Sequence, residues 1–119
     1  MTPQSALHDQ SKAFTLDALE RQRRQLDETY LEFLKNASLR AGIYALGVGE
    51  EDYQQPHEED EVYYVLSGRA AFRVGLEDRL VEPGSILFVA ARVAHKFHSI
   101  TEPLQLLVFF GSKREASRD

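Results

Sequence analysis

The sequence predicts an all-β protein, an antiparallel sandwich or barrel that follows one short helix. Two observations support this fold class. After Asn36 the chain divides into short segments rich in Val, Ile, Leu, Phe and Tyr, most of which end at glycine. Before Asn36 a single stretch, LDALERQRRQLDE, is rich in strong helix formers and contains neither Gly nor Pro. At 119 residues the chain has room for one domain.

The helix is expected over residues 16–28. Leu16, Leu19 and Leu26 recur at roughly helical spacing, and Thr15 stands where an N-cap is needed. The next stretch, TYLEFLK, fits either a continued helix or a strand. Residues 1–14 are polar and are expected to form a flexible segment, which leaves residues 15–119 as the folded domain.

The strand segments are expected to form a barrel of about eight or more strands. Pro83 and Gly84 suit the central positions of a type II turn, and residues 75–78 resemble a hairpin connection. The segment LQLLVFFG is apolar on both faces, so it needs a cover, either the N-terminal helix or a second subunit. We therefore expect a homodimer.

Composition excludes several classes of function. The net charge is -5 and no basic stretch alternates with aromatic residues, which argues against nucleic acid as a partner. The chain has no cysteine, so disulfides, thiolate metal sites and a cysteine nucleophile are excluded. The N-terminus lacks the features of a signal peptide, and the longest apolar run, Leu106–Phe110, is too short to span a membrane. We expect a cytoplasmic protein that binds a small molecule.

The segment QQPHEEDEVYYVLSG, residues 54–68, holds one histidine and a dense group of acids. Crowded carboxylates repel one another unless a cation lies among them. Gln55, His57, Glu61 and Tyr63 share strand parity, so a strand that begins near Gln55 would point all four into the barrel.

Further along the chain, His95 and Phe97 share one strand face, whereas His98 points the other way. Two histidines and a carboxylate that converge from two strands could bind a divalent cation, and the cation would stabilise the buried charge of Glu61. The alternative is that residues 57–61 form an exposed acidic turn and that His95 is bonded to a backbone carbonyl.

The spacing of these residues resembles the two motifs of the cupin family. The first motif has Gly, five residues, His-x-His, three or four residues, Glu, six residues and Gly. Residues 49–68 match it from Gly49 to Gly68, with Gln55 in place of the first His. The second motif has Gly, five residues, Pro-x-Gly, two residues, His, three residues and Asn. Residues 84–99 keep only its Gly84 and His95, with Ala90-Ala-Arg92 and Ser99 at the other positions.

This resemblance implies an antiparallel jelly-roll barrel with His57, Glu61 and His95 as metal ligands. Gln55 would be a weak ligand or would hydrogen-bond a metal-bound water. Two histidines and one carboxylate form the ligand set of non-haem Fe(II) oxygenases, so Fe(II) is the favoured metal, with Zn, Ni, Mn and Cu as alternatives.

The sequence leaves more than one function open. The first hypothesis is a mononuclear metal enzyme, of dioxygenase type, that acts on a small organic molecule. The alternatives are a non-catalytic module that binds a small ligand and a metal-dependent isomerase or lyase. Tyr63 is a candidate catalytic acid or base, although tyrosine also packs in strands. The acids of residues 50–52 and 58–60 argue against highly anionic substrates.

Overall fold

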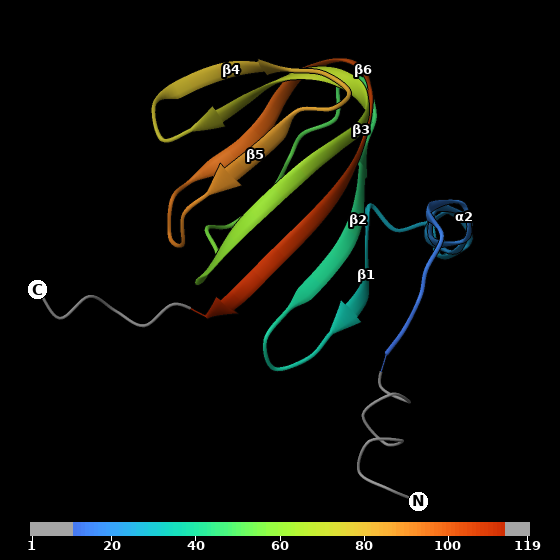
Figure 1. The fold of residues 1–119 in the computed structure, drawn as a ribbon. Helices are drawn as coiled ribbons and strands as arrows, with labels where there is room; N and C mark the ends of the chain where they lie inside the picture. Colours follow the sequence, from blue (N-terminus) through green and yellow to red (C-terminus); the bar gives the residue numbers. More distant parts are fainter. Residues whose placement is uncertain (1–10, 114–119) are drawn as a thin grey trace, which may run out of the picture.

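The computed structural model describes residues 11–113, which hold one helix and six strands. The elements are α2 (Leu16–Leu26), β1 (Tyr30–Lys35), β2 (Arg40–Leu46), β3 (Glu59–Val74), β4 (Glu77–Val81), β5 (Ile86–Val89) and β6 (His95–Lys113). Every strand pair is antiparallel. The prediction of an all-β antiparallel jelly-roll with a short N-terminal helix is confirmed (Figure 1).

The helix begins where the sequence predicts and ends two residues earlier. The Thr15 side chain accepts a hydrogen bond from the backbone N–H of Ala18 at 3.2 Å, as an N-cap does. Asp27 takes a left-handed conformation with φ 53° and terminates the helix, so Glu28 lies outside it. The ambiguous TYLEFLK segment forms strand β1. Of the predicted flexible segment, residues 1–10 lie outside the described range, and residues 11–14 have no regular structure.

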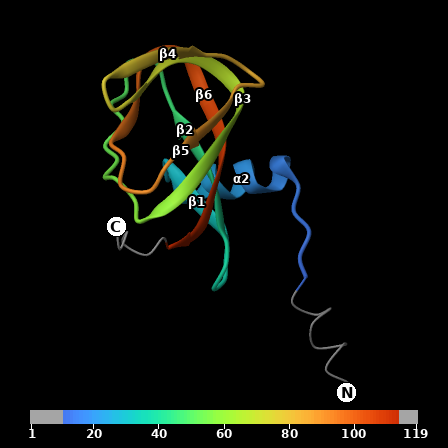
Figure 2. The same ribbon diagram turned by 60° about the vertical axis from the view of Figure 1, so that its left-hand side comes forward.

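The strands form a sheet in the order β1-β2-β6-β3-β4, and β5 also pairs with β3. Strands β3 and β6 run side by side over nearly their whole length, from the Glu59–Lys113 pair to the Val74–His95 pair. The first half of β3 pairs with β5 and the second half with β4. Figure 2 shows that the two long strands curve, so that β4 and β5 fold over the interior that β2 and β6 border.

The described residues form six strands, so the expectation of about eight or more is wrong for this part of the chain. The segments before and after Gly68 form one continuous strand, β3, and the segments before and after Pro103 form another, β6. The residues around Ser67-Gly68 do not end β3. Instead, the register with β6 shifts repeatedly between Val65 and Ala71, as at β-bulges, and the strand bends and continues. Gly68 is required at this bend: its φ is +97°, and a Cβ there would lie 2.2 Å from the carbonyl oxygen of Pro103.

The interior face of the sheet forms the hydrophobic core. Alternate residues of β6 are buried, with Leu104, Leu106, Val108 and Phe110 facing inward. The other core side chains include Leu46, Tyr63, Val65, Phe72, Val81, Val89, Phe97 and Ile100. This alternation fixes which side chains of each strand can reach an interior site.

The outer face of the same sheet is also apolar. Val62, Phe88 and Phe109 lie in one cross-strand row, and Tyr64, Ile86 and Leu107 lie in the next. Four of these six side chains are exposed: Tyr64, Ile86, Phe88 and Phe109. Helix α2 packs against β1 and β2, beside this area (Figure 1). The helix therefore does not cover the part of the face formed by β3 and β5.

The expected turns are present. The backbone N–H of Ser85 donates to the carbonyl of Glu82 at 2.9 Å, and Gly84 has φ +93°, as position i+2 of a type II turn requires. Gly75 and Leu76 connect β3 to β4 in a hairpin. Among the described residues, no helix is both long enough and apolar enough to span a membrane.

Candidate metal centre

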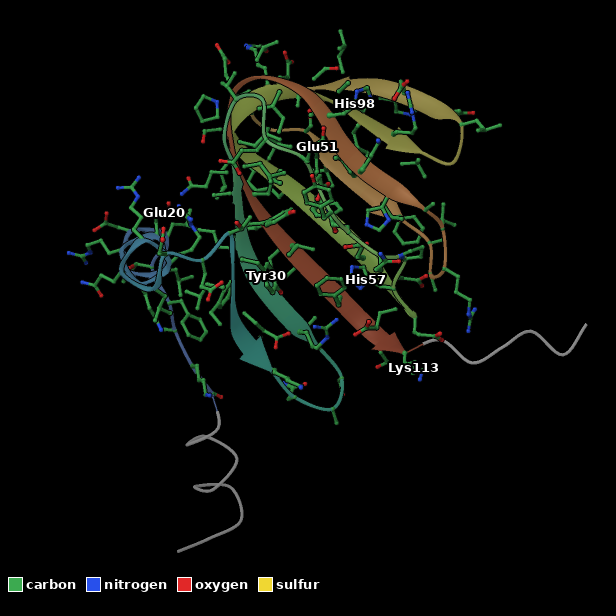
Figure 3. All side chains as sticks on the ribbon, turned by 180° about the vertical axis from the view of Figure 1, so that it is seen from behind. Glu20, Tyr30, Glu51, His57, His98 and Lys113 are labelled. Atoms are coloured by element: carbon green, nitrogen blue, oxygen red, sulfur yellow. The ribbon has the colours of Figure 1, made fainter. Side chains whose placement is uncertain are left out.

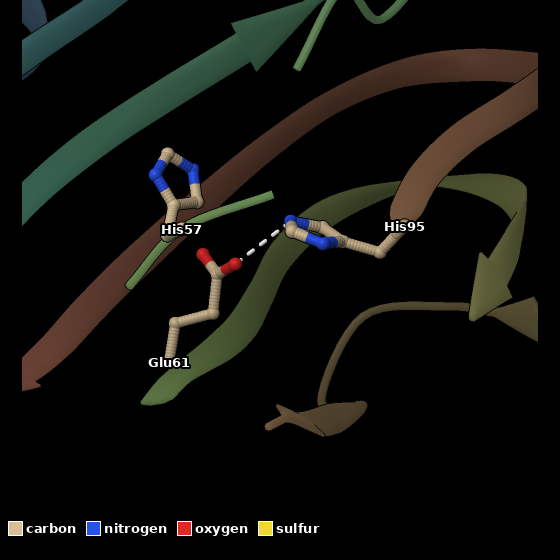
Figure 4. A group of neighbouring side chains, drawn as sticks. All are labelled: His57, Glu61 and His95. Atoms are coloured by element: carbon tan, nitrogen blue, oxygen red, sulfur yellow. Dashed lines mark ion pairs between the residues drawn. The ribbon is translucent and has the colours of Figure 1, made fainter. Parts of the chain in front are cut away.

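Three side chains that the sequence predicts as ligands meet inside the barrel. One possible ligand atom from each of His57, Glu61 and His95 lies within 4.8 Å of the other two (Figure 4). The side chains of Glu61 and His95 are each only 1% exposed, and His57 is half-buried. A buried carboxylate beside two imidazoles is an arrangement that needs a compensating cation.

Two of the three ligands come from regular strands. Glu61 lies on β3 between Val89 of β5 and Phe110 of β6, on the inward face. His95 is the first residue of β6 and pairs with Val74 at the far end of β3. The bend of the long strands brings these two residues together although they lie far apart along the sheet.

His57 reaches the site in a different way from the one predicted. Strand β3 begins at Glu59, so the strand alternation that grouped Gln55, His57 and Glu61 does not extend to residues 55 and 57, and that part of the prediction is wrong. His57 lies in the loop before β3. Its carbonyl accepts a hydrogen bond from the backbone N–H of Arg92 at 2.7 Å, and its ring makes an edge contact with Phe110 at 4.9 Å between centroids.

The hydrogen bonds of His95 determine where its ring can bind a cation. Nδ1 lies 2.9 Å from the carbonyl oxygen of Val93, which can only accept, so Nδ1 carries a proton. In the neutral ring Nε2 is then an unprotonated acceptor, and it lies 2.7 Å from Oε1 of Glu61, another acceptor. Either a second proton or a metal ion must lie between them.

When no metal is present, the surroundings stabilise the doubly protonated ring relative to a histidine in water. Burial opposes the charged ring, but the hydrogen bonds to Glu61 and to the Val93 carbonyl, together with the charge of Glu61, raise the pKa of His95 above its ordinary value. Even so, Nε2 of His95 and Oε2 of Glu61 are buried atoms without a hydrogen-bond partner of good geometry.

These features fit a divalent metal. Nitrogen and oxygen ligands bind Zn²⁺ at about 2.1 Å, so two ligands of one ion lie roughly 3 to 4 Å apart. The three ligand atoms are within 4.8 Å of one another, so small side-chain rotations suffice. The Val93 carbonyl holds the His95 ring in the orientation that a metal ligand requires, as outer partners of metal-bound histidines commonly do.

The other predicted site residues have different positions. Gln55 is exposed and borders the cavity beside His57, and it is outside the three-residue group. Tyr63 is 1% exposed, and its hydroxyl donates to Oε1 of Gln54 at 2.8 Å. Burial, followed by the charge of Glu61, raises the pKa of Tyr63 well above its usual value, so the phenol stays neutral.

His98 is separate from the centre, as its strand parity predicts. Its Nε2 lies 2.6 Å from Oδ1 of Asp78, and its Nδ1 lies 3.0 Å from the hydroxyl of Ser99. Figure 3 shows His98 near the β4 end of the molecule, away from His57. Arg69 and Arg73 are exposed and form salt bridges with nearby carboxylates, so neither guanidinium points into the centre.

Asp52 organises the site, and sequence reasoning missed it. Asp52 is one of the acids of residues 50–52, but unlike Glu50 and Glu51 it is only 6% exposed. Its carboxylate accepts hydrogen bonds from the Tyr44 hydroxyl at 2.6 Å, the Gln54 amide at 2.7 Å and the Phe97 backbone N–H at 2.8 Å. Asp52 thus connects the loop that carries His57 to β2 and β6, and through Gln54 to Tyr63.

A second residue that sequence reasoning missed contacts Phe110, the aromatic neighbour of the His57 ring. Arg40, at the start of β2, places its guanidinium 4.2 Å from the centroid of Phe110. It also binds Glu32 at 2.8 Å and Glu59 at 2.7 Å. Phe110 therefore contacts both the Arg40 guanidinium and the edge of the His57 ring. These contacts limit the movement of Arg40 and of His57.

Comparison with known proteins agrees with this architecture. The chain is 52% identical over 99 residues to the uncharacterized protein SCO3923 of Streptomyces coelicolor, covering 83% of this chain and 94% of that protein. The solved structure of TT1209 from Thermus thermophilus is 27% identical with a TM-score of 0.68, covering 87% of this chain and 100% of that one. An RmlC-like cupin from Shewanella frigidimarina is 24% identical with a TM-score of 0.64, over 72% of this chain and 77% of that one.

A chain from the crystal structures of the DMSP lyases RdDddP and RnDddQII is also similar. It is 27% identical with a TM-score of 0.65, over 74% of this chain. The present chain spans only about half of that protein, 52% of its length. The cupin domain family matches residues 42–110, which include both sequence motifs and all three candidate metal ligands. The chain is a member of the cupin family.

Proposed function

We propose that this cupin is a mononuclear metal enzyme of dioxygenase type that acts on a small organic molecule, with Fe(II) as the favoured metal. The observation that supports the proposal best is the group of His57, Glu61 and His95, two imidazoles and one carboxylate, in which Oε2 of Glu61 and Nε2 of His95 are buried without a hydrogen-bond partner. These three side chains would hold the metal with coordination positions left open, and Fe(II) held there would supply dioxygen activation and Lewis-acid chemistry.

The chain's own residues would prepare the site in three ways. Glu61 supplies a negative charge that offsets the cation in a buried environment. The Val93 carbonyl fixes the His95 ring with Nε2 toward the interior. The Tyr63 hydroxyl donates a hydrogen bond to Oε1 of Gln54, so its oxygen lone pairs remain available to accept a hydrogen bond from a bound substrate.

A metal-dependent lyase is the second candidate. The similarity to a chain from the DMSP lyase structures supports it. Dependence on dioxygen separates the two candidates, because an oxygenase consumes O₂ and a lyase turns over without it. A non-catalytic module would bind metal and ligand but would form no product.

The test begins with metal content. Mass spectrometry of the purified protein should give one divalent metal per chain. The Fe(II)-loaded protein is then supplied with a panel of diketones, catechols and thiols, in air and under anaerobic conditions. Oxygen uptake that depends on both substrate and Fe(II) supports the oxygenase. Anaerobic product formation supports the lyase, and tightly bound zinc without turnover supports the binding module.

We also propose a homodimer that acts in the cytoplasm. The apolar outer face formed by Tyr64, Ile86, Phe88 and Phe109 supports the dimer, because exposed apolar areas of this kind are typical of protein interfaces. A reducing compartment suits a site that prefers Fe(II), and the chain has no cysteine that would need oxidation.

A further inference from the structure

A cavity of about 540 Å³ opens beside His57 and extends over the inward face of β2 and β6. Five aromatic side chains contribute to its wall: Tyr30, Tyr44, Tyr53, Tyr63 and Phe110. Tyr30 and His57, which both border it, are labelled in Figure 3. Its volume is large enough for a small organic molecule.

The charges around the cavity are mainly negative. The exposed carboxylates of Glu50 and Glu51 lie at its wall. Arg40 is also part of the wall, but its guanidinium is already bound by Glu32 and Glu59, so these three side chains together carry one negative charge. The positive group that would recognise a carboxylate or phosphate is therefore already neutralised.

One aromatic ring of the wall already makes a cation–π contact with a side chain of the protein. The Arg40 guanidinium lies 4.2 Å from the centroid of Phe110, which is cation–π geometry. The other four aromatic side chains of the cavity are all tyrosines, which are suitable partners for the same interaction. Electron-rich rings with nearby carboxylates favour a cationic ligand group over a neutral or anionic one.

We propose that this cavity binds the positively charged group of a small organic cation, such as a quaternary ammonium, beside the metal centre. As a statement about the enzyme's substrate class, the inference rests on the proposed function. As a statement about binding, it depends only on the cavity. The uncharged part of the ligand would extend toward His57, and the cation would lie among the tyrosines and Glu51.

A matched set of probes tests the charge preference. Choline carries the cation, 3,3-dimethylbutan-1-ol is its neutral carbon isostere, and 3,3-dimethylbutanoate is a similar anion. Calorimetric titration should show choline binding about tenfold more tightly than the alcohol, with the acid weakest. Equal or tighter binding of the alcohol or the acid, or no binding of any probe, would overturn the inference.

Variants locate the site. Glu51→Gln and Tyr53→Leu should reduce the preference for choline over the alcohol several-fold, and both positions are exposed, so the fold should tolerate them. Glu102→Gln is the matched control for Glu51→Gln, because Glu102 is an exposed carboxylate on β6 that does not line the cavity. If Glu102→Gln alters the preference as much as Glu51→Gln does, the cavity is not the binding site.

The titrations are done on metal-loaded and metal-free protein, with metal content measured on the same samples. A choline preference in a protein that binds no metal would support the cavity inference and contradict the proposed function. One metal ion per chain without a choline preference would support metal binding by the proposed centre and contradict the cavity inference. The two proposals can therefore fail separately.

Discussion

Nε2 of His95 lies 2.7 Å from Oε1 of Glu61, and both side chains are only 1% exposed. Because Nδ1 of His95 is bound to the Val93 carbonyl, this short contact needs either a second proton on the ring or a metal ion. Proton and metal therefore compete for the same position. This competition gives the first prediction.

The stabilising effect of metal should increase with pH. In the metal-free protein the pKa of His95 is raised, so protonated His95 stabilises the fold. This stabilisation is fully present below the unfolded-state pKa of about 6.5 and is lost as the pH rises through the raised folded-state pKa. Metal binding requires the neutral ring and so becomes stronger over the same range. Thermal unfolding with and without metal should show a larger metal-induced rise in Tm at about pH 8 than at about pH 6. A rise that is equal at both pH values, or larger at the lower one, would contradict the competition.

Asp52 should control the geometry of the site without touching the metal. Asp52→Ala leaves the donors of Tyr44, Gln54 and Phe97 without their acceptor, which should lower the free energy of unfolding by about 3 kcal/mol. Metal affinity should fall roughly tenfold or more, as is typical when residues that orient ligands are lost. Asp52→Asn keeps an acceptor oxygen and should restore part of both properties.

Chemical denaturation and metal titration check this prediction. Glu102→Ala serves as the control, since Glu102 is an exposed carboxylate on β6 outside the site. If Asp52→Ala loses stability but binds metal as tightly as wild type, Asp52 is only a structural residue.

The side chain at position 55 should contribute little to metal affinity as glutamine and more as histidine. Gln55 is exposed and outside the three-residue group, so Gln55→Ala should weaken metal binding only a few-fold. Gln55→His should tighten zinc or nickel binding, because imidazole is a better donor to these ions than an amide oxygen. Competitive chelator titrations measure both effects. Unchanged zinc affinity in Gln55→His would mean that the loop keeps residue 55 out of reach.

The outer sheet face should form the dimer interface. Phe109→Glu or Ile86→Glu places a charge on this face and should convert the dimer into a monomer. Leu76→Glu is the control, because Leu76 is 99% exposed in the β3–β4 hairpin, away from the face. Light scattering gives the mass directly. A wild-type mass of 13.6 kDa at high concentration would exclude the dimer.

Local signals in the sequence predicted much of the fold. Thr15 marked the start of the helix, and Pro83-Gly84 marked a type II turn, because both depend only on neighbouring residues. The motif spacing found Glu61 and His95 on their strands. The length of β3 was not predictable in this way, since Gly68 resembles a strand end and only the close approach of Pro103 shows that it is a bend.

Two of the three departures from the second cupin motif coincide with an unusual backbone conformation that the sequence did not reveal. Arg92 and Ser99, which stand where the motif has Gly and Asn, both have positive φ, 69° and 51°. Glycine adopts this conformation without strain and asparagine tolerates it, whereas Arg and Ser take it less readily. The backbone N–H of Arg92 also holds the His57 carbonyl, so the strained turn helps to place a metal ligand.

Asp52 escaped prediction for a different reason. Its neighbours Glu50 and Glu51 are exposed acids, and nothing in the local pattern separates it from them. Its three hydrogen-bond donors come from β2, from its own loop and from β6, which only the tertiary fold brings together. A buried carboxylate of this kind is identified by its partners, not by its sequence context.

The most direct test of the account is metal stoichiometry across four variants, with circular dichroism to verify that each one folds. The wild type should bind one divalent ion per chain, and His57→Ala, Glu61→Gln and His95→Ala should each abolish or severely weaken binding. His98→Ala should keep full stoichiometry, because His98 is bound to Asp78 away from the centre. A wild-type protein that binds no metal, or a His98→Ala protein that loses metal while His95→Ala retains it, would contradict the assignment of the site.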